Sequence, residues 1–293
     1  NLQADRLKRI KPSMTVAINV KANALRSQGK DILVLAAGEP DFDTPLNIRN
    51  AAKKAMDQGK TRYVPGKGTT ELQQAIINKF KKDNNISYSS EEVMVGVGGK
   101  HIIYNAMMAT LNPNDEVIIP APFWVSYPDI VLLAEGKPII VECNSKQNFK
   151  ITPSQLEENI TPKTKWLMLN SPSNPTGSIY SFSELKALSE VLIKFPNILI
   201  LTDDIYEKII YEDNAFHTLA SVEPRLKDRI LTLNGVSKAY CMTGWRLGYC
   251  GGPKEIIAGM NKIQSQSTTS TSSISMAAAV EALNGPQEFI KKH

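Results

Sequence analysis

The stretch VSKAYCMTGWRLGY, residues 236–249, places an amine and a guanidinium among glycines and aromatic side chains. Lys238 precedes Arg246 by eight residues, and Gly244 and Gly248 flank the arginine. A lysine amine that loses its proton acts as a nucleophile and as a base, whereas a guanidinium binds phosphate with a planar fork. Glycines let the backbone approach a ligand closely. The stretch therefore predicts a phosphate-binding site next to a reactive lysine.

Five short apolar runs of the chain are each followed by glycine, proline or polar residues. In open α/β sheets, ligands bind beyond the carboxyl ends of the strands. Each such segment alone is typical of an ordinary turn, but five that include a lysine, an aspartate and an aromatic residue indicate one shared crevice. The segments are GGK (98–100), PAPFW (120–124), NSPSNPTG (170–177), TDDIY (202–206) and NGVSK (234–238).

The residue types in these segments fit a phosphorylated aromatic cofactor held by the lysine. Gly99 and Lys100 begin a predicted helix, whose free N–H groups and dipole favour a phosphate. Arg246 can bind the same phosphate, and Trp124 can cover the cofactor ring. Asp203 can pair with a protonated pyridine nitrogen, which is the arrangement that pyridoxal phosphate requires. GVGGKH (96–101) lacks the spacing of a P-loop, and no G-x-G-x-x-G opens a helix.

The elements that must position these residues alternate between strands and helices. Helical periodicity predicts helices over 100–111 and 184–195, and Ser181 and Glu184 have the spacing of a capping box. The strands are short and almost continuously apolar, as is typical of strands buried on both faces. We therefore expect an α/β fold with a mostly parallel, seven-stranded sheet flanked by helices. The predicted strands are 93–97, 116–119, 138–142, 166–169, 198–201, 230–233 and 247–250.

Two polar segments leave alternatives open. Residues 264–275, QSQSTTSTSSIS, are either a flexible linker or an extended polar segment that lines a site. Lys79, Lys81 and Lys82 form the densest basic group in the chain, and we expect them to be a solvated helix end.

Composition bounds the class of protein. The 293 residues are 42% hydrophobic and 22% charged, which indicates a globular chain with a sizeable core. The net charge of +5 is spread along the sequence, so nucleic acid is not an expected partner. Three cysteines without a C-x-x-C pair favour a reducing compartment, and no apolar run is long enough to span a membrane. We expect a cytoplasmic protein without a metal site, since the three histidines are scattered.

The same segments resemble the class I aminotransferases of pyridoxal-phosphate fold type I. The resemblance is closest to bacterial aspartate aminotransferases of the type that also acts on prephenate. It covers nearly the whole chain in the family's order, and NPTG combined with SK…GWR is a highly specific pair. The matching segments are KPSMTVAI (11–18), GEPDFDTP (38–45), KTRYVPGKG (60–68), VGGK (97–100), PAPFWVSYP (120–128), NSPSNPTG (170–177), DDIYE (203–207), SKAYCMTGWRLGY (237–249) and QSQSTTS (264–270).

The resemblance implies a role for each residue of the crevice. Lys238 resembles the lysine that forms a Schiff base with pyridoxal phosphate, and Asp203 resembles the partner of its ring nitrogen. Asn174 and Tyr206 resemble the pair that binds its phenolic oxygen. Arg246 with the amides near Gly99 and Lys100 resembles the phosphate cradle, Ser237 is a further cofactor contact, and Trp124 resembles the stacking residue. Lys238, Asp203 and Tyr206 are the expected catalytic residues.

Other implied roles concern the substrate and a second subunit. Gly38, Asn174 and Trp124 resemble contacts to the substrate, and Lys11 resembles a lysine linked to prephenate use. Tyr63 resembles a tyrosine donated to the neighbouring subunit's phosphate, so a homodimer is expected. Judged from the residues alone, Trp124 is also compatible with a core aromatic residue, as is Tyr206, and Lys11 with a plain surface lysine.

The resemblance also implies a reaction and a domain organisation. The expected activity moves the amino group of aspartate to 2-oxoglutarate in a ping-pong sequence. The alternatives are another reaction of pyridoxal phosphate, such as β-elimination, and a non-catalytic module of the same fold. Residues 1–46 are expected to form an N-terminal arm and part of a smaller α/β domain, and residues 47–293 the large cofactor-binding domain. The family continues past a segment like EALNGPQEFIKKH, so a C-terminal small domain is expected to lie outside this sequence.

Two prolines in the cofactor loops give a backbone prediction. Ala121–Pro122 and Asn174–Pro175 both lie in tight loops at strand ends, beside residues expected to contact the cofactor. X-Pro bonds adopt the cis form in only about 5–6% of cases. The resemblance points to cis bonds at both positions.

Overall fold

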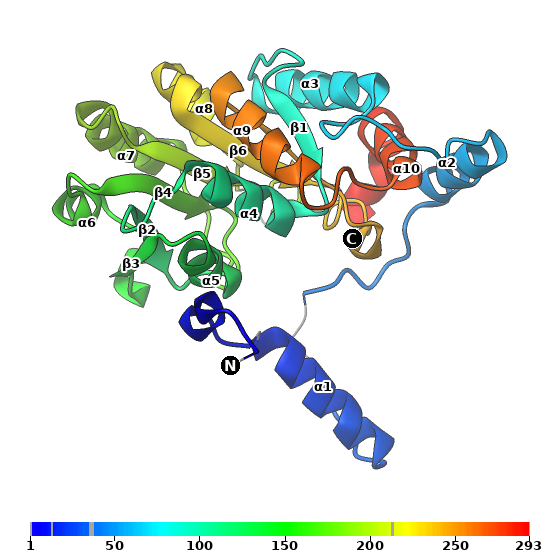
Figure 1. The fold of residues 1–293 in the computed structure, drawn as a ribbon, viewed down its shortest axis with the longest axis horizontal. Helices are drawn as coiled ribbons and strands as arrows, with labels where there is room; N and C mark the ends of the chain where they lie inside the picture. The colour runs from blue at the N-terminus through cyan, green and yellow to red at the C-terminus, as the bar shows by residue number, and fades with distance from the viewer. Residues whose placement is uncertain (1, 13, 35–37, 212–213, 293) are drawn as a thin grey trace.

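The computed structural model describes residues 2–12, 14–34, 38–211 and 214–292. Within these ranges, a sheet covered by helices makes up the body of the molecule, and an N-terminal arm extends from it (Figure 1). None of the helices in this part of the chain combines the length and apolar character that crossing a membrane requires. The same residues contain no group of three or more His, Cys, Asp and Glu that could hold a metal ion.

The body is built on a seven-stranded sheet in the order β1-β7-β6-β5-β4-β2-β3. All pairs are parallel except those of β7, which runs antiparallel to both β1 and β6. The prediction of seven strands in a mostly parallel sheet is confirmed. The strands are β1 Val93–Gly96, β2 Glu116–Ala121, β3 Lys137–Glu142, β4 Thr164–Asn170, β5 Leu199–Asp203, β6 Ile230–Gly235 and β7 Gly248–Gly251.

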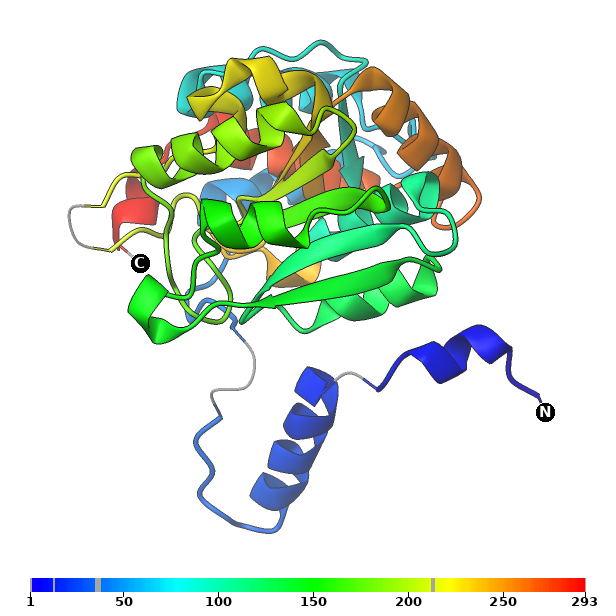
Figure 2. The same ribbon diagram turned by 90° about the vertical axis from the view of Figure 1, so that its left-hand side faces the viewer.

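Helices cover both faces of the sheet, as Figures 1 and 2 show. One apolar core lies between the sheet and helices α2, α3, α6, α7, α8 and α10, and the other lies between the sheet and α4, α5 and α9. Burial on both faces explains why the central strands are apolar along their whole length. The helices are α1 Met14–Ser27, α2 Leu46–Asp57, α3 Thr70–Asn84, α4 Gly99–Thr110, α5 Ser126–Leu133, α6 Pro153–Asn159, α7 Phe182–Lys194, α8 Leu219–Val222, α9 Lys254–Ser265 and α10 Ser273–Asn284.

A local signal in the sequence marks the start of α7. At α7, the Ser181 side chain accepts a hydrogen bond from the Glu184 amide and the Glu184 side chain accepts one from the Ser181 amide, which confirms the predicted capping box. The short 3-10 helices are η1 Asp5–Arg9, η2 Ser145–Gln147, η3 Pro224–Arg229, η4 Thr243–Trp245 and η5 Glu288–Lys292.

Strand order reverses between β2 and β4, which places a crevice at the carboxyl ends of these strands. From β2 the chain passes to the edge strand β3, and it then returns to the other side of β2 to form β4, β5 and β6. Such a reversal leaves the loops after neighbouring strands pointing apart, so that a ligand fits between them. The loops that follow β2, β4, β5 and β6 carry the segments selected from the sequence.

Two predictions about these segments are tested directly by the backbone. The bonds Ala121–Pro122 and Asn174–Pro175 are both cis, as predicted, and Ser171–Pro172 is a third cis bond that we did not predict. We expected the polar segment 264–275 to be either a flexible linker or an extended segment lining a site, and residues 268–273 do line a hollow together with residues 61–64. The segment contains the end of α9, a short turn and the start of α10.

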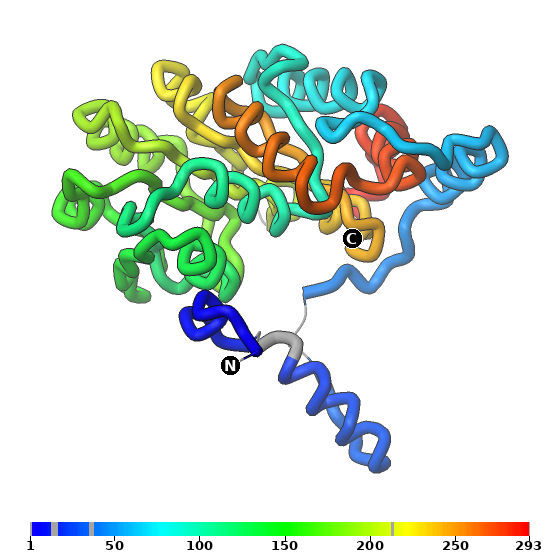
Figure 3. Tube along the Cα trace, in the orientation of Figure 1, coloured from blue at the N-terminus to red at the C-terminus, as the bar shows by residue number. Residues whose placement is uncertain are grey.

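The N-terminal arm contacts the body through η1 and then extends away from it (Figure 1). Helix η1 packs against α5, and Arg9 donates a hydrogen bond to Glu135 at 3.0 Å. Helix α1 then points away from the sheet, and the chain returns beside it before reaching α2 (Figures 2 and 3). This path carries Gly38 and Glu39 to the crevice, where they lie beside Lys238 and Thr243.

Candidate functional site

The loops after β4 and β5 are tied together by one asparagine at the end of β4. Asn170 lies opposite Asp203 in the register of the two strands, and its side-chain nitrogen Nδ2 donates a hydrogen bond to the Asp203 backbone carbonyl at 2.7 Å. Its side-chain oxygen accepts a hydrogen bond from the Asn174 amide at 2.7 Å. Asn170 therefore fixes where the NPTG turn lies relative to Asp203. We did not select Asn170 from the sequence, although it opens the NSPSNPTG segment.

Asp203 is a buried carboxylate at the end of β5. It accepts hydrogen bonds from the Tyr127 hydroxyl at 2.7 Å and from the Ile205 amide at 3.3 Å. Burial raises its pKa to about 6, although the bond from Tyr127 acts in the opposite direction. A carboxylate with so few partners in such a place suits a cationic ligand atom, whose charge would stabilise the ionised form.

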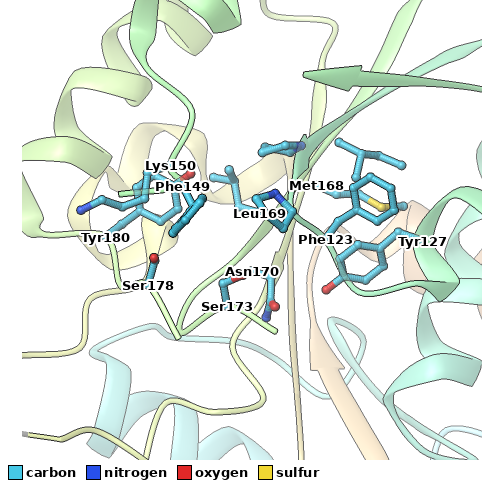
Figure 4. Close-up of a pocket in the computed structure, with 13 residues that line it drawn as sticks. Phe123, Tyr127, Phe149, Lys150, Met168, Leu169, Asn170, Ser173, Ser178 and Tyr180 are labelled. Carbon is cyan, nitrogen blue, oxygen red and sulfur yellow. The ribbon is translucent and has the colours of Figure 1, made fainter. Parts of the chain in front are cut away.

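Tyr127 is a second residue of this site that we did not select from the sequence. It lies on α5, three residues after Trp124, and the two rings pack edge to face with centroids 5.5 Å apart. Burial, and next the nearby Asp203, raise the pKa of Tyr127 well above its usual value, so the phenol keeps its proton. Figure 4 shows Tyr127 with Phe123, Asn170 and Ser173 around a small pocket next to the crevice.

We expect Tyr127→Phe to lower kcat about tenfold while the protein stays folded, because a second contact that orients a functional carboxylate contributes on this scale. Tyr88→Phe is a matched control, since Tyr88 is a buried tyrosine whose hydroxyl bonds only to Thr232 among the contacts of the described residues. Steady-state kinetics on both variants make the comparison. Equal effects of the two substitutions would show that Tyr127 does not support Asp203.

Lys238 lies in the crevice beside Tyr206. Its amine is 5.9 Å from the centroid of the Tyr206 ring and donates a hydrogen bond to the Gly38 carbonyl. Burial lowers the pKa of Lys238, and the positive charge of Arg246 lowers it further, against an opposing effect of Glu39. A lysine that loses its proton more easily than usual suits a nucleophile or a base. The crevice is lined by Gly38, Asn174, Tyr206, Lys238 and neighbouring residues of their loops.

A second group of residues forms a cationic hollow at the start of α4. Gly99 and Lys100 open this helix, and the Lys100 amine lies 4.9 Å above the Trp124 ring. Burial, and then Arg246, lower the pKa of Lys100. No ion pair joins Lys100 or Arg246 to a carboxylate among the residues that the structure describes. Two unpaired cations at a helix N-terminus fit a dianionic phosphate.

Glycines are required where this hollow forms. Gly98 has φ 82°, and the nearest atoms to a side chain placed there belong to the Arg246 guanidinium. A Cβ on Gly248 would lie 2.5 Å from the Gly99 amide nitrogen and 2.6 Å from the Gly98 carbonyl carbon. The start of α4 and β7 can therefore be this close only because residue 248 has no side chain.

We predict that Gly248→Ala weakens binding of a phosphate ligand in the hollow and destabilises the fold by about 1–3 kcal/mol, since the clash is with backbone that cannot move aside. Equilibrium dialysis with pyridoxal phosphate and denaturant unfolding measure the two effects. Gly244→Ala is the control, because no atom lies within 4 Å of a Cβ at that position. Wild-type affinity in Gly248→Ala would contradict this description of the hollow.

The remaining predicted residues lie at different distances from the crevice. Ser237 is buried next to Lys238, and Trp124 is partly buried against Lys100 and Tyr127, outside the lining of the crevice. Tyr63 is 95% exposed and lines a separate hollow with residues 268–273, and Lys11 is exposed on the arm. Tyr63 and Lys11 are therefore not brought to the crevice within one chain. Of the three lysines that we expected at a solvated helix end, Lys81 and Lys82 are exposed as expected, but Lys79 is only 5% exposed, so the expectation is wrong for Lys79.

Asp204 differs from its neighbour Asp203. It is also buried, and its Oδ2 atom has no hydrogen-bond partner within the described part of the chain. Burial raises its pKa well above the usual range, which disfavours the charged form of this carboxyl. Asp203, with a pKa raised to about 6, is the carboxylate whose charge acts on Tyr206 in the crevice.

Comparison with known proteins is consistent with this geometry. The sequence model for "Aminotransferase class I and II" matches residues 30–293. A protein named aspartate/prephenate aminotransferase from Cereibacter sphaeroides is 56% identical over 287 residues, which are 98% of this chain and 72% of that protein.

Solved structures give the same result. The aspartate aminotransferase from Rhizobium meliloti superposes with a TM-score of 0.97 at 50% identity, over 100% of this chain and 73% of that one. The aspartate aminotransferase from Thermus thermophilus with maleate gives a TM-score of 0.95 at 43% identity, over 100% of this chain and 75% of that one. The chain therefore belongs to the class I and II aminotransferases and has their fold type I architecture.

Proposed function

We propose that this chain transfers the amino group of aspartate to 2-oxoglutarate with pyridoxal phosphate as its cofactor. The observation that carries the proposal is that Tyr206 links the two groups: its ring centroid lies 5.9 Å from the amine of Lys238, whose pKa burial lowers, and the buried carboxylate of Asp203 acts on its hydroxyl. Relatives named aspartate aminotransferase and aspartate/prephenate aminotransferase, at 50–56% identity, support the substrate.

The residues present fit the proposed cofactor. The hollow formed by Arg246, Gly99 and Lys100 offers two cations and a helix N-terminus to its phosphate. Asp203 would pair with its ring nitrogen, and Trp124 would cover its ring. When bound, pyridoxal phosphate supplies a ring that withdraws electrons from the substrate's α-carbon.

Four side chains of the crevice and its surroundings would each have a separate role in the reaction. Lys238 would hold the cofactor and, once its amine is free, move a proton from the substrate, for which a lowered pKa is favourable. Asp203 would keep a proton on the ring nitrogen. The Tyr206 hydroxyl and the Asn174 amide would bind the phenolic oxygen, which orients the ring. Burial raises the pKa of Tyr206, so its hydroxyl remains a hydrogen-bond donor near neutral pH.

The proposal extends to the substrate and to a second subunit. The Gly38 amide and Asn174 would bind the substrate α-carboxylate. Tyr63 is too exposed to serve its own crevice, which supports a homodimer in which it reaches the neighbouring phosphate. Lys11 would take part in prephenate use, a second substrate favoured by the names of the relatives. Residues 47–293 would form the large domain, and residues 1–46 the arm with the start of a smaller one.

An assay with two substrates tests this function. The protein loaded with pyridoxal phosphate is mixed with aspartate and 2-oxoglutarate, and oxaloacetate and glutamate are measured together. We expect equal amounts of both products, and loss of the cofactor's absorbance band when aspartate is added alone. Release of ammonia without glutamate would indicate an elimination reaction instead. No change of the absorbance band and no product would indicate a non-catalytic module.

A further inference from the structure

A closed triad of buried polar side chains lies behind the segment that carries Asp203 and Tyr206. The Lys79 amine donates to the Asn84 side-chain oxygen at 2.7 Å and forms an ion pair with Glu207. The Asn84 amide nitrogen donates to the other carboxylate oxygen of Glu207 at 2.9 Å. The side chains of Lys79 and Glu207 are only 2% and 6% exposed. Each member thus contacts the other two, and water is excluded.

Stability alone is a weak reason for such an arrangement. Removing two charges from water is costly, and apolar side chains of similar volume are often at least as stable in the same place. Lys79 also lies on the buried stripe of α3, beside Ile76 and Phe80, where an apolar residue would serve packing directly. Unlike apolar packing, an ion pair with fixed partners defines the relative direction and register of the two segments that it joins.

The triad binds the chain at Glu207, immediately after the predicted catalytic residue Tyr206. Glu207 follows Tyr206 in the chain, and its amide donates to the Asp204 carbonyl at 2.9 Å. The Asp204 amide in turn donates to the Leu233 carbonyl of β6 at 2.9 Å. Residues 203–207 are therefore a tight turn, held at its start by the sheet and at its end by α3.

The last turn of α3 makes a second contact with the same segment. Asp83 forms an ion pair with Lys208 at 2.8 Å, and both side chains are about one quarter exposed. Helix α3 is itself packed against β1 and α10. The end of the turn is therefore anchored to a helix fixed on two sides.

We propose that the triad of Lys79, Asn84 and Glu207 is a positioning device that sets the place of Tyr206, whose ring centroid lies 5.9 Å from the Lys238 amine. The proposal rests on the proposed function, in which Tyr206 donates to the phenolic oxygen of the cofactor. A hydroxyl displaced by a fraction of an ångström loses most of that bond, and misplacement on the scale of 1 Å costs up to about a hundredfold in rate.

The test uses the double variant Lys79→Met/Glu207→Met, loaded with pyridoxal phosphate, which removes both charges and leaves neither one unpaired. The readout is the pH midpoint at which the absorbance of the bound cofactor changes. A donor to the phenolic oxygen favours its anionic form, so loss of that donor raises the midpoint. We expect a rise of about half a pH unit or more, with kcat about tenfold lower.

A matched control separates positioning from general stability. Lys227 and Glu92 form a partly buried ion pair at 2.7 Å, at the amino ends of β6 and β1 and away from the crevice. Lys227→Met/Glu92→Met should leave the midpoint and kcat unchanged, whatever it does to the melting temperature. Should the first double variant fail to fold, Asn84→Ala removes only the bridging amide, and a smaller rise of the midpoint is expected.

The decisive step repeats the test in a Tyr206→Phe background. If the triad acts through the Tyr206 hydroxyl, Lys79→Met/Glu207→Met produces no further change there. A wild-type midpoint and kcat in the double variant, or an undiminished effect in the Tyr206→Phe background, would overturn the proposal. Failure of the proposed function would look different, because the unmodified protein itself would then show neither the absorbance change with aspartate nor transamination.

Discussion

Lys238→Ala is expected to lower the rate of amino transfer by at least about a thousandfold, because the group that moves the substrate proton is lost. The fold should survive, since the only hydrogen bond of the Lys238 amine within the described structure is to the Gly38 carbonyl. The phosphate hollow is built from other residues, so pyridoxal phosphate should still bind. Steady-state kinetics, equilibrium dialysis and thermal unfolding measure the three expectations.

Lys254→Ala is the control for this substitution. Lys254 is an exposed lysine paired with Glu91, and its loss should leave activity near the wild-type level. Appreciable transamination by purified Lys238→Ala would contradict the assignment of this lysine.

Asp203→Asn is expected to lower kcat by about a hundredfold or more, and to weaken cofactor binding far less. An asparagine still accepts the hydrogen bond from Tyr127, but it carries no charge to hold a proton on the ring nitrogen. Turnover near the wild-type level would mean that Asp203 is a structural residue. Kinetics and equilibrium dialysis on the same preparation give the two effects.

Although Asp203→Asn is expected to lower activity, it should increase the stability of the cofactor-free protein. Folding raises the pKa of Asp203 from 3.8 to about 6, so its contribution to stability is fully present below about pH 4 and is lost as the pH rises through 6. The difference corresponds to roughly 3 kcal/mol. Asp203→Asn should therefore stabilise the cofactor-free protein by up to this amount at pH 8, and much less at pH 4. Denaturant unfolding at both pH values checks this, and equal effects at the two would contradict it.

Much of the scaffold could be predicted because its signals are local. Each strand is an apolar run bounded by polar residues, and the strands of the centre are buried on both faces, which removes ambiguity about the side that faces the core. The capping box of Ser181 and Glu184 depends only on residues three apart. The placement of the loops after β2, β4, β5 and β6 at the carboxyl edge of the sheet followed from strand polarity alone.

The parts that could not be predicted depend on contacts between distant segments. The bond from Tyr127 to Asp203 joins residues 76 positions apart, and the Asn84 contact with Glu207 joins residues 123 positions apart. Lys79 did carry a signal that we overlooked, because it follows Ile76 by three residues on the apolar stripe of α3. The composition of the segment 264–275 was compatible with its lining a hollow, but it concealed two helix ends, one of which is capped by Ser272.

The central claim is that Lys238 holds the cofactor, and reduction followed by peptide mapping tests it most directly. The protein is incubated with pyridoxal phosphate, reduced with sodium borohydride and digested, and each peptide is weighed by mass spectrometry. The account predicts one stoichiometric phosphopyridoxyl label, on the peptide that contains Lys238. A label on Lys100 or another lysine with Lys238 unmodified, or no stoichiometric label at all, would contradict it.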